Sequence, residues 1–509
     1  MTLIDKKLQE LQMLFNKGAH QKSIEELEQL SAEYPNEGKV ILQLAFNHFK
    51  LMDWPKANNY IEKLVRQFGS QEYYLHCAVD FYLQTSQYLK AIPVQERICE
   101  DKGDHNQKHK LAMLYIKSFA HDKAHGLYKE ILANKPDDIY AIGVLADIEH
   151  GDGNFSQAID LYKHILDIQP NSATALYGIV KSTKFKNVDT HIEKIATQII
   201  ENALVGDDQK IEAHMALGKM YDDCNMHDKA WLHWSQGNSL QSKLFPYDGK
   251  QVDEQVKLIK ESFTSELLSK YQHKGNQDVS PIFIVGMPRS GTTLLEQVLE
   301  RSGCICAAGE SPALNKAVNG RLYNIRFPQD IGLAPASLFA DLASDYLDYI
   351  ANCHVEGKLR SVDKLPGNFL YLGLLKLMFP NMKVINMKRN KQDNALSIFA
   401  NMFSNHMTFT NTLEGIAHMQ ELHDDMMEHW QGIFSDNILS LDYEEFVSNF
   451  ETQAREVFDF TGLEWNDSVV DFVNSKNKVF TPSSYQVRQG INTKAINRSD
   501  PYLKKLAEC

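Results

Sequence analysis

The chain has 509 residues, of which 43% are hydrophobic and 23% charged, so it has the composition of a soluble globular protein and the length of two or more domains. A formal net charge of −13 argues against nucleic acid as the main partner, because surfaces that bind nucleic acid are basic. The seven cysteines are scattered, without histidines at ligand spacing, which predicts a reducing compartment and no metal site. The N-terminus becomes charged at once and no long apolar run follows, so we expect no targeting segment, no membrane span and a cytoplasmic location.

The N-terminal half carries a small residue every 33 or 34 positions. The series consists of Ser23, Ala57, Ala91, Ala124 and Ala158. A proline follows three of these residues after 12 positions, where it would end a helix. Alanines at helical spacing also occur in plain helical bundles, but five members in one phase favour a repeat. The pattern resembles the tetratricopeptide repeat (TPR), which implies an α-solenoid over residues 1–245.

Residues 246–280 are predicted to form a helical linker, and the character of the sequence changes at residue 281. Short apolar runs then alternate with amphipathic patterns, for example at residues 370–379 and 393–403. Strands are expected at residues 282–285, 359–362, 383–387 and 437–441. This alternation predicts a P-loop-like α/β domain over residues 281–509, with a central parallel sheet that binds ligands at the carboxyl ends of its strands.

The most informative segment is the loop after the first of these strands. The strand ends at Gly286, the loop contains Arg289, and a helical pattern opens at Thr292. In this order, backbone N–H groups and the positive end of the helix dipole converge on one spot, which predicts a site for an anion. The loop differs from G-x-x-x-x-G-K-[ST], because no lysine follows Gly291 and an arginine stands inside the loop instead. An arginine fork suits a group with several oxygens.

The string Gly-x-Pro-Arg-Ser-Gly-Thr-Thr at residues 286–293 resembles the 5′-phosphosulfate loop of sulfotransferases that use 3′-phosphoadenosine 5′-phosphosulfate (PAPS). The form P-R-S-G-T-T is most similar to that of the tyrosylprotein sulfotransferases and their bacterial relatives with TPRs. The resemblance implies that the 5′-phosphosulfate is held by Arg289, Ser290, Gly291, Thr292 and Thr293. A generic nucleotide loop, or a helix start capped by Ser and Thr, is the alternative interpretation.

Four other residues match positions that bind the nucleotide in this family. Arg389 follows the strand at 383–387, and Ser397 lies eight residues later, about two helical turns on. The resemblance implies that this pair holds the 3′-phosphate, that Arg498 is a further cation there, and that Tyr443 contacts the adenosine side. Without the resemblance, Arg389 would be expected to pair with Asp393, Tyr443 to lie in the core, and Arg498 to be a solvated cation.

The resemblance also implies a set of catalytic residues, in which Arg289 has a second role. Glu310 lies 21 residues after Arg289, as the catalytic glutamate does in the tyrosylprotein enzymes, and would take the proton from the acceptor hydroxyl. Lys364 would neutralise charge on the leaving phosphate. Ser483 would contribute a hydroxyl to the transition state. The alternatives are a surface Glu310, a Lys364 paired with Asp363, and a polar C-terminal loop.

These matches predict a PAPS-dependent sulfotransferase that needs no metal, because Arg289, Lys364, Arg389 and Arg498 would converge and supply the positive charge. By analogy with TPR grooves, which hold peptides and proteins, the acceptor is expected to be a protein or peptide hydroxyl such as that of tyrosine. The oligomeric state is left open. Two other interpretations also stay open: another nucleotide-dependent transferase such as a kinase, and a non-catalytic TPR scaffold with a relic sulfotransferase domain.

Overall fold

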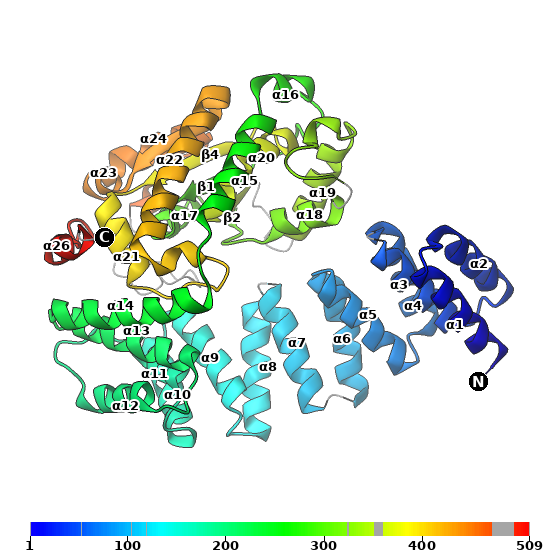
Figure 1. Cartoon of the computed structure of the whole chain (residues 1–509), viewed down its shortest axis with the longest axis horizontal. Coiled ribbons are helices and arrows are strands. Elements are labelled where there is room, and N and C mark those ends of the chain that lie inside the picture. The colour runs from blue at the N-terminus through cyan, green and yellow to red at the C-terminus, as the bar shows by residue number, and fades with distance from the viewer. Residues whose placement is uncertain are drawn as a thin grey trace. The chain divides into compact units, whose positions relative to one another are not determined.

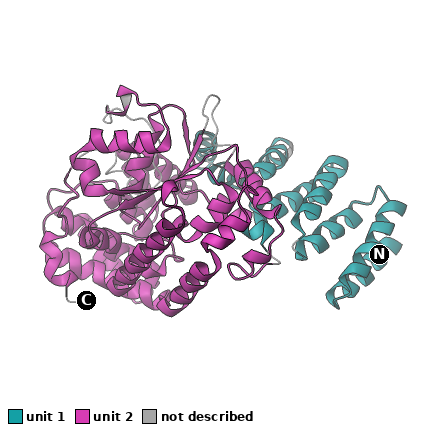
Figure 2. Ribbon diagram, turned by 90° about the horizontal axis from the view of Figure 1, so that it is seen from above, with its two compact units in different colours: residues 1–136, 318–323 teal, residues 137–317, 324–509 magenta. Residues whose placement is uncertain are grey.

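The computed structural model describes residues 2–51, 53–102, 104–118, 120–322, 325–350, 360–470 and 493–507. The chain forms two compact units, residues 1–136 with 318–323 and residues 137–317 with 324–509 (Figure 2). Within the described segments, no helix combines the length and the apolar character that crossing a bilayer requires.

The first unit is a succession of α-helices in which each helix contacts the next (Figure 1). They are α1 (Leu3–Asn16), α2 (His20–Glu33), α3 (Gly38–Lys50), α4 (Trp54–Phe68), α5 (Glu72–Gln84), α6 (Tyr88–Lys102), α7 (His105–Lys117) and α8 (His121–Asn134). Several begin at a residue whose side chain accepts the N–H group of the third helical residue, such as Asp53 before α4 and Asp104 before α7. The succession confirms the predicted helical repeats.

The second unit begins with further helices of the same kind. They are α9 (Ile139–Asp152), α10 (Phe155–Ile168), α11 (Ala173–Lys181), α12 (Thr190–Glu201), α13 (Asp207–Asp223) and α14 (His227–Leu244), followed by α15 (Gly249–Ser262) and α16 (Ser265–Lys270). The pairs α9 with α10 and α13 with α14 make the most extensive contacts.

The small residues of the 34-residue series explain how the helices approach one another. Ala57, Ala91, Ala124 and Ala158 lie in α4, α6, α8 and α10, and each is completely buried. A small side chain lets the backbone of one helix approach a large side chain on the next. At Gly178 in α11, for example, a Cβ atom would lie 2.5 Å from a ring carbon of Tyr162 in α10.

A parallel sheet forms the centre of the second unit. Within the described residues its strands run in the order β2-β3-β1-β4-β5. Their bounds are β1 (Ile282–Gly286), β2 (Ile305–Ala307), β3 (Arg360–Asp363), β4 (Lys383–Lys388) and β5 (Ile438–Asp442). Every neighbouring pair is parallel. The predicted fold, an α-solenoid followed by an α/β domain with a central parallel sheet, is therefore confirmed. Strand β2 is absent from the predicted set, because three residues are too short for a periodic pattern.

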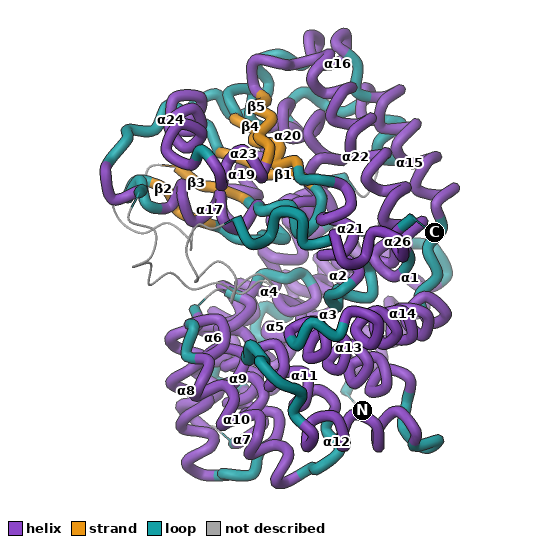
Figure 3. The backbone as a smooth tube through the Cα atoms, turned by 90° about the vertical axis from the view of Figure 1, so that its left-hand side faces the viewer, coloured by secondary structure: helices purple, strands orange, loops and turns teal. Residues whose placement is uncertain are grey.

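Helices cover both faces of the sheet (Figure 3). Ile282 and Ile284 of β1 face a core that also contains apolar residues of α17 (Thr292–Glu300), α23 (Tyr443–Ser448) and α24 (Phe450–Thr461). Phe283 points to the opposite face, where its ring contacts Tyr346 of α19 (Leu338–Ile350) and Phe379, directly after α20 (Leu372–Met378). The remaining helices are α18 (Ala313–Arg321), α21 (Lys391–Phe399), α22 (Leu413–Phe434) and α26 (Leu503–Leu506). Every residue of β1 is buried, and residues 282–285 accordingly form a continuous apolar run.

Candidate active site

The loop between β1 and α17 has the backbone shape of an anion cradle. Arg289 and Gly291 adopt positive φ angles of 65° and 103°, while Ser290 between them does not. Alternating backbone conformations of this kind turn successive N–H groups towards one point. At Gly291 a Cβ atom would lie 2.5 Å from the ring of Tyr443, so this position requires glycine. Gly291 is also the N-cap of α17 and offers no side chain to the helix N–H groups.

Two arginines that are far apart in the sequence lie together at this loop, because they follow the neighbouring strands β1 and β4. Arg389, just after β4, donates from Nη1 to the carbonyl oxygen of Arg289 at 2.8 Å and from Nη2 to that of Ala495 at 2.8 Å. Arg289 Nε donates to the hydroxyl of Ser397 in α21 at 3.2 Å. The guanidinium of Arg389 lies over the ring of Tyr443, 4.9 Å from its centroid. The structure thus brings together the loop, Arg389, Ser397 and Tyr443.

Arg498 reaches the same region because its neighbours in the chain are fixed to α21. Asp393 is buried, and its carboxylate accepts the backbone N–H groups of Asn497 at 2.7 Å and Ser499 at 2.8 Å. Its carboxylate hydrogen bonds therefore go to the C-terminal segment, and the pairing of Arg389 with Asp393 that stood as an alternative is not formed. The side chain of Arg498 instead donates to Asp222 of α13 at 2.9 Å.

Burial and neighbouring positive charge destabilise the charged forms of Arg289 and Arg389. The pKa of Arg289 is lowered to about 9, first because the guanidinium is desolvated and then because Arg498 and Arg389 repel its charge. Burial is also the main cause that lowers the pKa of Arg389. Because arginine stays protonated near neutral pH, this repulsion persists until an anion enters. A ligand with negative charge would relieve it.

A second charged group lies at the ends of β2 and β3. Lys364 Nζ donates to Glu310 Oε1 at 2.7 Å, and the side chain of Lys364 is completely buried while that of Glu310 is 48% exposed. Asp363 does not pair with this lysine. It accepts hydrogen bonds from Tyr346 at 2.9 Å and Asn368 at 3.2 Å, and burial raises its pKa to about 7. Glu310 is thus an accessible carboxylate held by a buried ammonium group.

Glu296 is a buried carboxyl group beside this pair that the sequence analysis missed. It lies in α17, and its Oε1 accepts the backbone N–H of Gly309 at 3.0 Å. The carbonyl oxygen of the same glycine accepts the N–H of Lys364 at 2.9 Å. Burial raises the pKa of Glu296 to about 7, although Lys364 opposes the rise. Glu296 thereby fixes the turn that presents Glu310. The sequence carries little signal for this role, because α17 also contains the polar residues Gln297 and Glu300.

An apolar cavity of about 500 Å³ joins the two groups. Its polar lining includes Arg289, Thr292, Thr293 and Glu310. Most of the remaining lining is apolar and is called here the apolar wall, with Phe369, Tyr371, Met402, Phe403, Met407 and Met419 among its residues. A cavity with a few polar groups in a largely apolar lining fits a ligand that carries a polar reacting group on an apolar body.

Helix α11 also contributes a residue that the sequence analysis did not identify. Burial raises the pKa of the Tyr177 hydroxyl, whereas a backbone hydrogen bond with Met402 and the charge of Arg289 oppose that rise. Tyr177 therefore lies close to Met402 and Arg289, which both line the cavity. Among the predicted site residues, Ser483 lies outside the described part of the chain. The roles assigned to the other eleven stay predictions.

Known proteins match both parts of the chain. Residues 281–467 match the model of the Sulfotransferase family. An uncharacterised protein of Aquifex aeolicus is 33% identical over 379 residues, which cover 72% of this chain and 49% of that protein. The protein-tyrosine sulfotransferase of Drosophila melanogaster is 24% identical over 273 residues (50% of this chain, 54% of that protein), and protein-tyrosine sulfotransferase A of Caenorhabditis elegans is 26% identical over 221 residues (40% and 56%). The chain spans about half the length of these relatives.

Proposed function

We propose that the protein transfers a sulfuryl group from PAPS to an acceptor hydroxyl, because residues 281–467 match the Sulfotransferase family and the chain is similar to protein-tyrosine sulfotransferases. The observation that carries the proposal is the group of three arginines beside the loop after β1. Burial and the charge of Arg498 lower the pKa values of Arg289 and Arg389, and Asp222 is the carboxylate that pairs with Arg498. A group of three buried or half-buried guanidinium side chains at one loop supports a site for a polyanion.

The donors present fit a nucleotide with charge at two ends. The loop offers backbone N–H groups and hydroxyls for the 5′-phosphosulfate, and Arg389, Ser397 and Arg498 offer a second set for the 3′-phosphate. Two buried donors support the fit, because Ser290 Oγ and Arg389 Nε have no hydrogen-bond partner among the residues that the structure describes. Buried donors of this kind are costly unless a ligand satisfies them. Tyr443, whose ring lies under the Arg389 guanidinium, would contact the adenosine side.

The residues around the cavity have distinct tasks in this proposal. PAPS, when bound, supplies the sulfuryl group. Arg289 and the helix terminus stabilise negative charge at the transferring group, and the ammonium of Lys364 does so at the leaving phosphate. Glu310 takes the acceptor's proton on its carboxylate, which the ion pair with Lys364 holds in place. These cations supply the charge that a metal ion supplies in kinases, so activity is expected to persist in a metal chelator.

The apolar wall of the cavity supports an acceptor hydroxyl on an aromatic or otherwise apolar body. A tyrosine side chain meets this description, and we propose a protein or peptide tyrosine recruited by the helical repeats in the cytoplasm. Methionines at Met402, Met407 and Met419 suit a wall that adapts to more than one acceptor.

Transfer of radiolabelled sulfate from PAPS to proteins of a cell extract tests the activity and the acceptor class together. Label is expected on tyrosine, and label on small molecules alone would contradict the proposed acceptor. Thermal unfolding with 3′-phosphoadenosine 5′-phosphate (PAP) or with ATP tests the nucleotide. Stabilisation by PAP is expected, whereas stabilisation by ATP alone would favour a kinase, and no response to either would favour a scaffold.

A further inference from the structure

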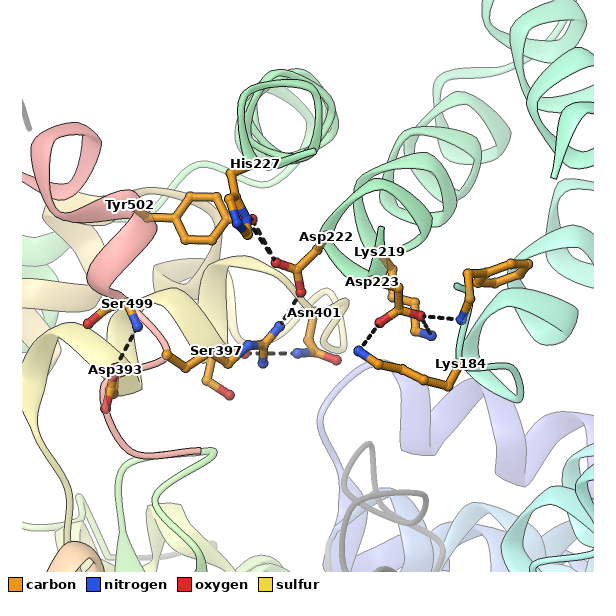
Figure 4. A network of polar contacts seen from close by, with 12 residues as sticks. Lys184, Lys219, Asp222, Asp223, His227, Asp393, Ser397, Asn401, Ser499 and Tyr502 are labelled. Carbon is orange, nitrogen blue, oxygen red and sulfur yellow. Dashed lines mark hydrogen bonds and ion pairs between the residues drawn. The ribbon is translucent and has the colours of Figure 1, made fainter. Parts of the chain in front are cut away.

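The C-terminal segment of the α/β domain is attached to two helices of the repeat region. Asp222 near the end of α13 accepts two hydrogen bonds, one at Oδ2 from Arg498 at 2.9 Å and one at Oδ1 from the Tyr502 hydroxyl at 2.6 Å. Figure 4 shows this carboxylate between the segment and α13. The segment also contacts α14, because His227 Nδ1 lies 3.1 Å from the Tyr502 hydroxyl oxygen.

Tyr502 holds Asp222 in a fixed place. Its side chain is 1% exposed and packs against Trp234 and Trp231, with ring centroids 5.7 Å and 6.0 Å apart. Burial alone would raise the pKa of Asp222, but the charge of Arg498 and the hydrogen bonds from Tyr502 and Arg498 hold it below its usual value. Asp222 is therefore an ionised, anchored acceptor at neutral pH.

The guanidinium of Arg498 depends on this acceptor for its direction. The backbone on either side of Arg498 is fixed by Asp393, whereas its side chain, among the described residues, hydrogen-bonds through Nη2 to Asp222. The guanidinium of Arg498 lies close enough to Arg289 and Arg389 for its charge to lower the pKa values of both. A single-nitrogen contact leaves the rest of the fork for a ligand.

We propose that Asp222 is a positioning residue of the cofactor site, which aims Arg498 at the 3′-phosphate, so that helix α13 of the repeat region contributes to nucleotide binding. This inference rests on the proposed function. It differs from a role as a simple counter-ion, because removal of a counter-ion would make the site more positive and tighten anion binding, whereas removal of a positioning group loosens it.

Two nucleotides that differ in one group separate this role from a general loss of structure. PAP carries the 3′-phosphate and adenosine 5′-phosphate (AMP) lacks it, so the ratio of their dissociation constants, measured by calorimetry on the full chain, reports on the 3′-phosphate site. In Asp222→Ala the PAP affinity is expected to fall about tenfold, with AMP affinity unchanged. Asp222→Asn keeps an oxygen for Arg498 and an N–H group for Tyr502, so it is expected to bind PAP nearly as wild type does.

The next residue on the same helix gives a matched control. Asp223 is also buried and ionic, but it pairs with Lys184 at 2.6 Å, with Lys219, and with the backbone N–H of Phe185 (Figure 4). Asp223→Ala therefore disturbs α13 without touching Arg498, and is expected to leave the ratio of PAP to AMP affinity unchanged. If Asp222→Ala unfolds, Tyr502→Phe removes one support of the carboxylate and is expected to lower the ratio about twofold.

The outcomes are distinct. Weaker PAP binding in Asp222→Ala with AMP unchanged supports the inference. Equal or tighter PAP binding in Asp222→Ala, or an equal loss of PAP and AMP, overturns it while leaving the proposed function in place. If the wild-type chain does not prefer PAP over AMP, the 3′-phosphate site itself is absent, and the inference falls together with the proposed function.

Discussion

In the first unit, the positions at 34-residue spacing bury alanine against a neighbouring helix, whereas the strand ends of the α/β domain bury charged and hydroxyl side chains. Among the described residues between 2 and 136, no buried side chain is Asp, Glu, Lys or Arg. The buried hydroxyls of Ser23, Thr85 and Ser118 donate to backbone carbonyl oxygens of the same unit. In the α/β domain, by contrast, Glu296, Asp363, Lys364 and Asp393 are all buried.

The contrast separates two uses of burial. Apolar burial at a fixed period stabilises a stack of helices and needs nothing from a ligand. Burial of charge is costly unless the groups are paired, so a concentration of such groups at one edge of a sheet indicates a site rather than a core. The repeats should therefore respond to changes of volume, and the sheet edge to changes of charge.

The largest effect is expected at Arg289. Arg289→Ala should lower kcat/KM for sulfate transfer about 10⁴-fold, within the range known for arginines that neutralise a transferring phosphoryl group. Arg289→Lys keeps the charge but loses the guanidinium fork, so its kcat/KM should lie between those of the wild type and Arg289→Ala. Arg455→Ala is the control, because Arg455 pairs with Glu451 on the surface of α24. This variant should change kcat/KM little. Activity of Arg289→Ala within tenfold of wild type would remove this residue from the mechanism.

Glu310→Gln should lower kcat about 10³-fold, the middle of the range for a general base. PAP binding should be nearly unchanged, because Glu310 lies in the group at β2 and β3 and not among the three arginines. Steady-state kinetics and calorimetry on the same preparation measure both quantities. A parallel loss of PAP affinity would show that Glu310 acts through the structure of the loop instead.

Ionisation of Glu296 should make the stability of the fold depend on pH. Its pKa is raised from 4.5 to about 7 in the folded state, so its protonated form stabilises the fold below pH 4.5, and that stability is lost as the pH rises towards 7. Glu296→Gln mimics the protonated form. Its stability relative to wild type should grow by up to about 3 kcal/mol between pH 4.5 and 7 and stay constant above. Thermal unfolding at pH 5 and pH 8 measures this, and an equal difference at both values would refute it.

Sequence patterns predicted the parts of this molecule that are determined by short segments of the chain. The repeat period placed Ala57, Ala91, Ala124 and Ala158 at buried crossings, and strand-helix alternation gave four of the five strands. The grouping of Arg289 with Arg389 was also predictable, because parallel strands end at one edge.

Side-chain contacts between residues that are far apart in the sequence could not be predicted. Asp222 lies 276 positions from Arg498, and no local feature distinguishes it from Asp223, which bonds to lysines of the repeats instead. Tyr177 likewise occupies an ordinary helical position in α11. Such contacts are set by how the repeat helices pack on the α/β domain within the second unit, which no pattern along one segment encodes.

The smallest expected effect tests the other side of the comparison. Ala124 in α8 is completely buried, so Ala124→Leu should overpack the helix crossing and lower the free energy of unfolding of the first unit by about 1 to 3 kcal/mol. Ala133 in the same helix is exposed, and Ala133→Leu should change stability by less than about 0.5 kcal/mol. Because the repeat positions of the first unit respond to volume and hold no charge, PAP affinity should stay at its wild-type value in both variants. Calorimetric binding of PAP beside urea unfolding measures the two quantities, and a loss of PAP affinity in Ala124→Leu would mean that the two uses of burial are not separate.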